Sequence, residues 1–235
     1  MRHSSVLGFG GAAAHAVGIL YVLVGCTHFL LPRAQLRGAG GVTAAFFQSL
    51  SERSMIFSLH YWIVAVLSLL TIAVYLALLS LLREHLSGPL CWAAVVGIIG
   101  AALSTVDFAY VGVEAPRLAR VFSGASPAAQ SVLVVSGMPH IDPCFFASGL
   151  MGIFSLAANA VALRHRLLPR ALGYIGVIGG VVLLLVFMGA LFRSPRLIDV
   201  TVALGGLAIG PVWYFWVGFV LRRAGRSARV VGNET

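Results

Sequence analysis

The stretch Leu103-Ser-Thr-Val-Asp-Phe-Ala-Tyr-Val-Gly-Val-Glu114 closes a long apolar segment and carries an acid inside it. Read as a helix, it places Ser104, Asp107 and Glu114 on one face, because residues three, four and seven apart stack. Asp107 is then about 10 Å inside the end of the segment, at ~1.5 Å per residue. An ionised carboxylate in hydrocarbon costs roughly 3 kcal/mol. We therefore expect Asp107 to face the interior of a helix bundle, where it is protonated or paired.

The composition of the whole chain is that of a membrane protein. The chain has 235 residues, of which 60% are hydrophobic and 10% are charged, whereas soluble domains carry about 25% charged residues. The basic residues number 16, all of them arginine, against 7 acids. These arginines fall between apolar segments, where they anchor helix ends. The sequence predicts an all-α polytopic transmembrane bundle, with the lipid bilayer as its partner and without nucleic-acid binding.

Six stretches are long enough to cross about 30 Å of hydrocarbon, which takes roughly 20 apolar residues. They are Ala12–Leu31, Ile56–Leu82, Leu90–Val113, Asp142–Leu163, Leu168–Phe192 and Leu197–Leu221. Residues 1–235 then form a single transmembrane domain that ends in a basic tail, 222–235. We interpret Asp142 as the N-cap of the fourth span, with Pro143 at its first helical position. Ala44–Arg53 and Pro127–Met138 are expected to form short helices on the membrane surface.

The arginines suggest an orientation. Six spans place both termini on one side of the membrane. The terminal side holds Arg2, Arg83, Arg164, Arg166, Arg170, Arg222, Arg223, Arg226 and Arg229, and the other side Arg33, Arg37, Arg53, Arg117, Arg120, Arg193 and Arg196. Dense clusters next to short linkers favour cytoplasmic termini. We expect a bacterial inner-membrane protein whose first apolar run is retained.

Hairpin geometry gathers the polar residues on one side, whatever the orientation. The ends of spans 1, 3 and 5 and the starts of spans 2, 4 and 6 meet at one membrane face, which we name the polar face. Its members include Cys26, His28, His60, Tyr61, Asp107, Glu114, His140, Asp142, Cys144, Arg193, Arg196 and Asp199. This convergence predicts a functional site at the polar face.

Acids and imidazoles are the catalytic candidates, because a carboxylic acid desolvated in a membrane can donate a proton at neutral pH. They are Asp107, Glu114, His60, His140 and Asp142. The substrate-binding candidates are Tyr61, Trp62, Tyr110, Phe146, Arg193, Arg196 and Asp199, whose aromatic faces suit a cation and whose arginines suit an anionic head group.

Each candidate also has a structural interpretation. Asp142 can cap a helix, Glu114 and Asp199 can pair with nearby arginines, and the aromatic residues can form an interfacial belt. His28, His60 and His140 with Cys144 or Asp107 could ligate a metal, but without His-x-x-x-His or Cys-x-x-Cys spacing we assign no metal and no cofactor. Three distant cysteines do not indicate a disulfide framework.

Four local elements together resemble one family. They are Gly18-Ile-Leu-Tyr21, the aromatic second span from Tyr61-Trp62 to Tyr75, Leu168-Pro-Arg-Ala-Leu-Gly-Tyr-Ile-Gly176, and Gly210-Pro-Val-Trp213. The chain, over about residues 12–222, is similar to a family of bacterial six-helix membrane proteins described as a domain of unknown function. The resemblance implies an architecture and supplies no activity.

Three functions fit these observations. The first is an enzyme that protonates an isoprenoid or other lipid-like substrate through Asp107; size and buried acids make the chain similar to membrane-bound terpene cyclases, by analogy without a matched motif. The second is a proton-coupled carrier of a small solute, in which Asp107 titrates. The third is a non-catalytic scaffold or assembly subunit packed through glycine seams such as Gly176-x-x-x-Gly180.

Overall fold

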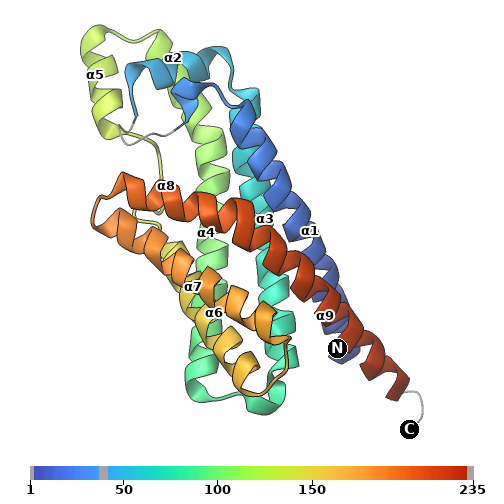
Figure 1. Ribbon diagram of the computed structural model, residues 1–235. Coiled ribbons are helices and arrows are strands. Elements are labelled where there is room, and N and C mark those ends of the chain that lie inside the picture. Colours follow the sequence, from blue (N-terminus) through green and yellow to red (C-terminus); the bar gives the residue numbers. More distant parts are fainter. Residues whose placement is uncertain (1–2, 37–41, 232–235) are drawn as a thin grey trace.

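The computed structural model describes residues 3–36 and 42–231, and all regular elements in these ranges are helices (Figure 1). In chain order they are α1 (His3–Leu30), η1 (Arg33–Gln35), α2 (Ala44–Glu52), α3 (Met55–Leu81), η2 (Arg83–His85), α4 (Gly88–Ser123), α5 (Pro127–Ser136), α6 (Phe146–Arg164), α7 (Arg170–Leu191), α8 (Pro195–Ala203), η3 (Leu204–Ile209) and α9 (Gly210–Val231). Five of these helices, and the continuous α8–η3–α9 helix, are long and apolar enough to cross a bilayer. The chain is therefore a multi-pass, all-α membrane protein.

The long helices are arranged as a closed ring. α1 packs between α9 and α3, α3 packs on α4, α4 on α6, and α6 on α7, while α8 and η3 close the ring against α7. The chain ends lie at one end of the bundle, and α2 and α5 lie at the other (Figure 1). This arrangement agrees with the parity of six spans, and it creates an interior that side chains from all of the long helices line.

A small cap stands on the polar face. α4 has 36 residues, or about 54 Å at 1.5 Å per residue, so it projects well beyond about 30 Å of hydrocarbon. The helix therefore continues beyond Val113, the predicted end of the span, as far as Ser123. Its projecting end packs with α2 and the chain around η1 through an apolar cluster. The cluster consists of Leu31, Phe46, Phe47, Leu50, Phe57, Val111, Ala115, Ala119 and Phe122. We name η1, α2, α5 and this end of α4 the cap.

The short helices of the cap agree with the sequence. α2 and α5 fall within the segments expected to lie on the membrane surface. Side-chain oxygens of Thr43 and Ser126 accept from the backbone N–H groups of Phe46 and Ala129, which are otherwise unsatisfied at a helix start.

The fourth span starts later than the sequence suggested. α6 begins at Phe146, not at Pro143. Phe145 takes a left-handed conformation, with φ of 53°, and this turn separates Asp142 from the helix that its side chain caps. The Asp142 side chain does accept from the first N–H groups of α6. The N-cap residue is however Phe145, so the predicted N-cap position of Asp142 and the helical position of Pro143 were wrong.

The last span carries an irregularity before Pro211. Pro211 lacks a backbone N–H and its ring crowds the preceding turn of a helix. The chain accommodates it through the wider π-helical turn η3, in which the N–H of Gly210 donates to the carbonyl oxygen of Gly205. α9 then continues to Val231, so most of the segment predicted as a basic tail is helical.

Glycines allow the closest approach in the α6–α7 hairpin. A methyl group at Gly152 would lie 2.9 Å from the carbonyl oxygen of Gly180, and one at Gly180 would lie 2.8 Å from Leu156. Gly176 is covered by the side chain of Asn159. The predicted seam along Gly176 and Gly180 is thus a helix–helix contact, which places α6 and α7 together as one wall of the ring.

Candidate functional site

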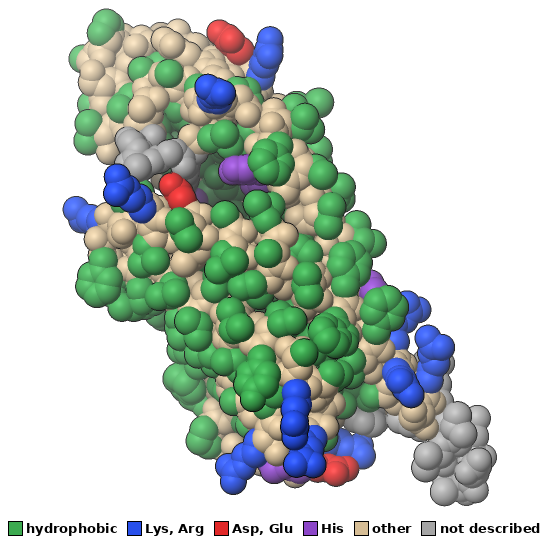
Figure 2. Space-filling view, viewed as in Figure 1, with side chains coloured by type: hydrophobic (Ala, Val, Ile, Leu, Met, Phe, Trp, Pro, Cys, Tyr) green, Lys and Arg blue, Asp and Glu red, His purple; other side chains and the backbone are tan. Residues whose placement is uncertain are grey.

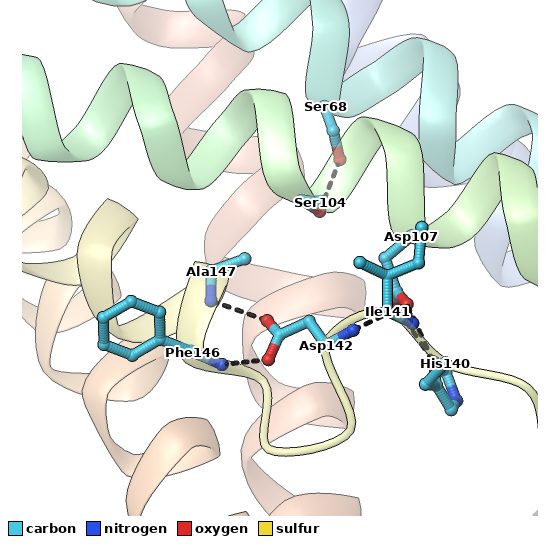
Figure 3. A network of polar contacts seen from close by, with 8 residues as sticks. All are labelled: Ser68, Ser104, Asp107, His140, Ile141, Asp142, Phe146 and Ala147. Carbon is cyan, nitrogen blue, oxygen red and sulfur yellow. Dashed lines mark hydrogen bonds and ion pairs between the residues drawn. The ribbon is translucent and has the colours of Figure 1, made fainter.

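The carboxylate of Asp107 lies at the centre of a polar network below the cap. Asp107 is only 3% exposed. Its Oδ2 lies 2.9 Å from Nδ1 of His140, and its Oδ1 accepts from the backbone N–H groups of Ile141 at 2.6 Å and Asp142 at 3.0 Å (Figure 3). The prediction that Asp107 faces the bundle interior and is paired is confirmed.

Asp142 extends this network to the start of α6. Its two carboxylate oxygens accept from the backbone N–H groups of Phe146, at 2.8 Å, and Ala147, at 2.7 Å (Figure 3). These N–H groups are among those that a helix leaves without internal partners, and a negative charge there also favours the helix dipole. Asp107 and Asp142 together hold the segment between α5 and α6 against α4.

The Asp107 carboxylate accepts from two backbone N–H groups, those of Ile141 and Asp142, and faces Nδ1 of His140. An ionised carboxylate only accepts hydrogen bonds, whereas a protonated one needs an acceptor for its own hydrogen. This environment suits an ionised, structural acceptor and not a proton donor. The carboxylate also directs the hydrogen of His140 onto Nδ1, as carboxylates do for functional histidines.

A cavity of about 740 Å³ occupies the interior of the ring. Side chains from α1, α3, α4, α6, α7, α8, η3 and α9 line it. Figure 2 shows the surface hollowed between α8 and the cap, with histidine side chains visible inside the hollow. Its volume falls within the roughly 300–1,000 Å³ of sites that enclose a small molecule.

Histidines and charged side chains line the mouth of the cavity. They are His28, His60, His140, Arg33 and Asp199. The rings of His28 on α1 and His60 on α3 have centroids 6.1 Å apart. His60 is further held by Thr27, whose Oγ1 lies 2.8 Å from its Nδ1. The sequence thus found the imidazoles that the fold brings together at one opening.

A stripe of polar side chains continues from His60 along one face of α3. Ser68, Thr71 and Tyr75 follow it at helical spacing, and all three line the cavity. Ser68 Oγ lies 2.9 Å from Oγ of Ser104 on α4 (Figure 3), and Thr71 Oγ1 lies 3.3 Å from the hydroxyl of Tyr214 on α9. We name His60, Ser68, Thr71 and Tyr75 the α3 stripe.

The fold divides the candidates in two. His60, His140, Tyr61 and Asp199 line the cavity, and Asp107 and Asp142 support its mouth from behind. The other candidates lie outside the cavity. Glu114 pairs with Arg117, Nε to Oε2, at 2.7 Å. The remaining residues of this second group are on the outer surface: Trp62, Tyr110, Phe146, Arg193 and Arg196.

Sequence reasoning missed most of the deep wall of the cavity. Tyr21, Ser68, Thr71, Tyr75 and Tyr214 were not among the candidates, although all are lining residues. A signal was present, because positions 60, 68, 71 and 75 are the polar positions of one face of an apolar span. Serine, threonine and tyrosine are common in membrane helices, so the spacing alone did not distinguish a cavity wall from a packing face.

Two further observations bear on the metal and disulfide interpretations. Within residues 3–36 and 42–231 no group of three or more His, Cys, Asp or Glu side chains is arranged to hold a metal ion. Cys26, Cys91 and Cys144 are free and exposed.

A second histidine pair lies at the opposite end of the bundle. The rings of His85 in η2 and His165 after α6 stack with centroids 3.7 Å apart and planes at 11°. Desolvation of the imidazole, followed by the charges of His85 and Arg164, lowers the pKa of His165 below its ordinary value. This pair joins the α3–α4 and α6–α7 connections.

Comparison with known proteins gives a family and no function. No curated protein and no solved structure matches the chain. A family model described as a domain of unknown function (DUF4386) matches residues 16–221, which include all or part of every long helix, the mouth of the cavity and the α3 stripe. The chain therefore belongs to the DUF4386 family of membrane proteins.

Proposed function

We propose that this protein binds an amphiphilic small molecule, taken from the bilayer, in the cavity of its helix ring. The observation that carries the proposal is the cavity of about 740 Å³, whose mouth has imidazole and charged side chains and whose inner wall is mostly apolar or aromatic, apart from polar side chains such as those of the α3 stripe. Such a gradient matches a molecule with a polar head and a hydrophobic tail. The proposal places the protein in the bacterial inner membrane, with cytoplasmic termini.

The support network gives the cavity a defined mouth. Asp107 and Asp142 fix the segment 137–145 through five hydrogen bonds from backbone or imidazole N–H groups. This segment brings His140 and Phe145 to the cavity wall. Binding sites built on side chains locked by such supporting contacts lose less entropy when a ligand binds.

Chemistry on the bound molecule is a second candidate, and the Asp107–His140 pair favours it. A carboxylate bonded to Nδ1 orients an imidazole and stabilises its protonated form, which is the arrangement of general bases in many hydrolases. In this version the base is His140 and the carboxylate positions it, in place of the direct proton donation by Asp107 that the sequence suggested. Carrier and scaffold functions are the alternatives against which both candidates are tested.

The test is lipid extraction and native mass spectrometry of the purified protein, with a variant that blocks the cavity. Gly206 lines the cavity, and a methyl group there would meet no atom within 4 Å. Gly206→Leu should fill part of the cavity without a backbone clash. We expect the wild-type protein to carry a bound amphiphile and the Gly206→Leu protein to carry several-fold less.

Gly88→Leu is the matched control. Gly88 is also a helical glycine with open space around its side-chain position, but it lies at the start of α4, away from the cavity. The control should carry as much amphiphile as the wild type. Equal loading of all three proteins, or a wild-type protein without any bound molecule, would contradict the binding function and favour a scaffold. Loss of substrate turnover in His140→Gln, with a normal amount of bound amphiphile, would favour the enzyme. Uptake of a solute without any turnover would favour the carrier.

A further inference from the structure

Thr27 determines which nitrogen of His60 carries the hydrogen. Thr27 Oγ1 lies 2.9 Å from the carbonyl oxygen of Leu23 and 3.0 Å from that of Val24, so its hydroxyl hydrogen is given to these acceptors. The oxygen of Thr27 then accepts from Nδ1 of His60, 2.8 Å away. A neutral imidazole has one donor and one acceptor nitrogen. His60 in its neutral form therefore has its lone pair on Nε2.

Nε2 of His60 is a polar atom at the mouth that the contact with Thr27 leaves for a ligand. The contact with Thr27 uses Nδ1, and the ring lines the mouth of the cavity. The neighbouring groups at the mouth, His28 and Arg33, supply N–H donors. A head group that fits both must donate one hydrogen bond to Nε2 and accept another from a cationic or imidazole N–H. A hydroxyl group does both, whereas an ether or an ionised carboxylate has no hydrogen to donate.

The α3 stripe sets the length of the site. His60 and Tyr75 both line the cavity and are 15 positions apart, which corresponds to about 22 Å along a helix at ~1.5 Å per residue. Spread over this length, 740 Å³ gives a mean width of about 6–7 Å. The cavity is therefore long for its volume, which suits one extended chain better than two side by side.

The wall at depth suits an unsaturated chain. Tyr21, Tyr75, Phe154 and Tyr214 line the inner part of the cavity, and aromatic rings make favourable edge and face contacts with other π systems. Tyr75 and Phe154 meet edge to face, with centroids 4.5 Å apart.

We infer, on the basis of the proposed binding function, that the ligand is a single-chain amphiphilic alcohol of isoprenoid type. Its hydroxyl donates to Nε2 of His60 at the mouth, and its chain extends along the aromatic inner wall toward Tyr75. Thr27 acts as a positioning residue, because it holds His60 in the acceptor tautomer.

The experiment is binding of labelled geranylgeraniol to the full-length protein in nanodiscs, with three competitors. These are unlabelled geranylgeraniol, its methyl ether, and a diacylglycerol, which keeps a hydroxyl but has two chains. We expect the alcohol to compete roughly tenfold better than the ether, since a buried hydrogen bond is worth about 1.4 kcal/mol. The diacylglycerol should compete poorly.

Two variants test whether the preference for the alcohol over the ether depends on His60 and Thr27 at the mouth. His60→Phe should bind the alcohol and the ether equally, at the level of the ether. Thr27→Val, which removes the acceptor for Nδ1, should reduce the preference while it leaves ether binding unchanged. A preference for the alcohol that survives in His60→Phe would overturn the inference, as would equal binding of alcohol and ether in the wild type, or displacement by diacylglycerol as strong as by the alcohol.

The same assay separates this inference from the binding function. Saturable binding that Gly206→Leu abolishes and Gly88→Leu retains, with no preference for the hydroxyl, supports the cavity and rejects the alcohol. No saturable binding of geranylgeraniol, in a protein from which another amphiphile is extracted, also rejects the alcohol alone. Binding that is the same in Gly206→Leu and wild type rejects both.

Discussion

His140 and Asp107 lie 33 positions apart in the chain and are joined by a contact of 2.9 Å between Nδ1 and Oδ2. The carboxylate belongs to the middle of α4, and the imidazole belongs to the segment that leads into α6. Both side chains are almost fully buried. The contact therefore fixes an irregular segment to a rigid helix at the level where the ring opens.

Asp107 variants should separate charge from shape. Asp107→Asn keeps the volume but places an amide N–H₂ among N–H donors, and we expect a loss of roughly 1.5–3 kcal/mol, typical of hydrogen bonds to a charged group. Asp107→Ala removes the carboxylate that these groups contact and should cost about 3–5 kcal/mol. Thermal unfolding in detergent measures both. An unchanged transition temperature in Asp107→Ala would show that the network does not support the fold.

Asp142→Ala should destabilise the first turn of α6. Loss of a capping side chain typically costs about 1 kcal/mol, and the loss here frees the N–H groups of Phe146 and Ala147. Hydrogen exchange of these two amides should accelerate while that of the α6 interior stays unchanged. Asp142→Asn, which keeps an acceptor oxygen, is the control, and it should show a smaller acceleration. Equal exchange rates of these two amides in all three proteins would show that Asp142 does not cap α6.

Gly180→Ala should disturb the α6–α7 hairpin. The added methyl group would lie 2.9 Å from the backbone nitrogen of Leu156, and a helix backbone cannot give way as a flexible side chain can. Overpacking of this kind costs about 1–3 kcal/mol. Gly88→Ala meets nothing within 4 Å and should be neutral. The difference between their thermal transitions checks the prediction, and similar transitions would mean that the helices are less closely packed.

The stacked pair His85–His165 should make stability depend on pH at the terminal end of the bundle. The folded-state pKa of His165 is lowered from its ordinary 6.5. Because the pKa of His165 is lower in the folded protein than in the unfolded chain, the unfolded chain binds more protons once the pH falls below about 6.5. Protonation therefore favours unfolding, and the free energy of unfolding decreases as the pH falls through this value. We expect the transition temperature to fall between about pH 7 and pH 5.

His165→Phe is the control for this pair. Phenylalanine keeps a ring that can stack on His85 but cannot be protonated, so the fall in transition temperature at low pH should become smaller. A fall of the same size in wild type and variant would assign the pH dependence to other groups.

Particular residues show how far the sequence went toward the site. Asp107 was recognised because an acid within an apolar segment needs a partner, and this reasoning is local. Its partners, the backbone N–H groups of Ile141 and Asp142, carry no signal in the sequence. Trp62 and Tyr110 were predicted as binding residues, but they lie on the outer face of helices that border the cavity. Neighbouring positions of a helix point in different directions, so a shift of one or two residues separates the lining face from the outer face.

The sequence by itself determined the membrane class, the number of spans, the even parity that collects histidines and acids at one face, and the two surface helices. These features depend on apolar run length and on helical periodicity, which are properties of neighbouring residues. Tertiary structure alone decided that α4 continues into a cap, that the ring encloses a cavity, and that Asp107 is an acceptor. Those features depend on distances between helices far apart in the chain, which packing sets and no local pattern of residues contains.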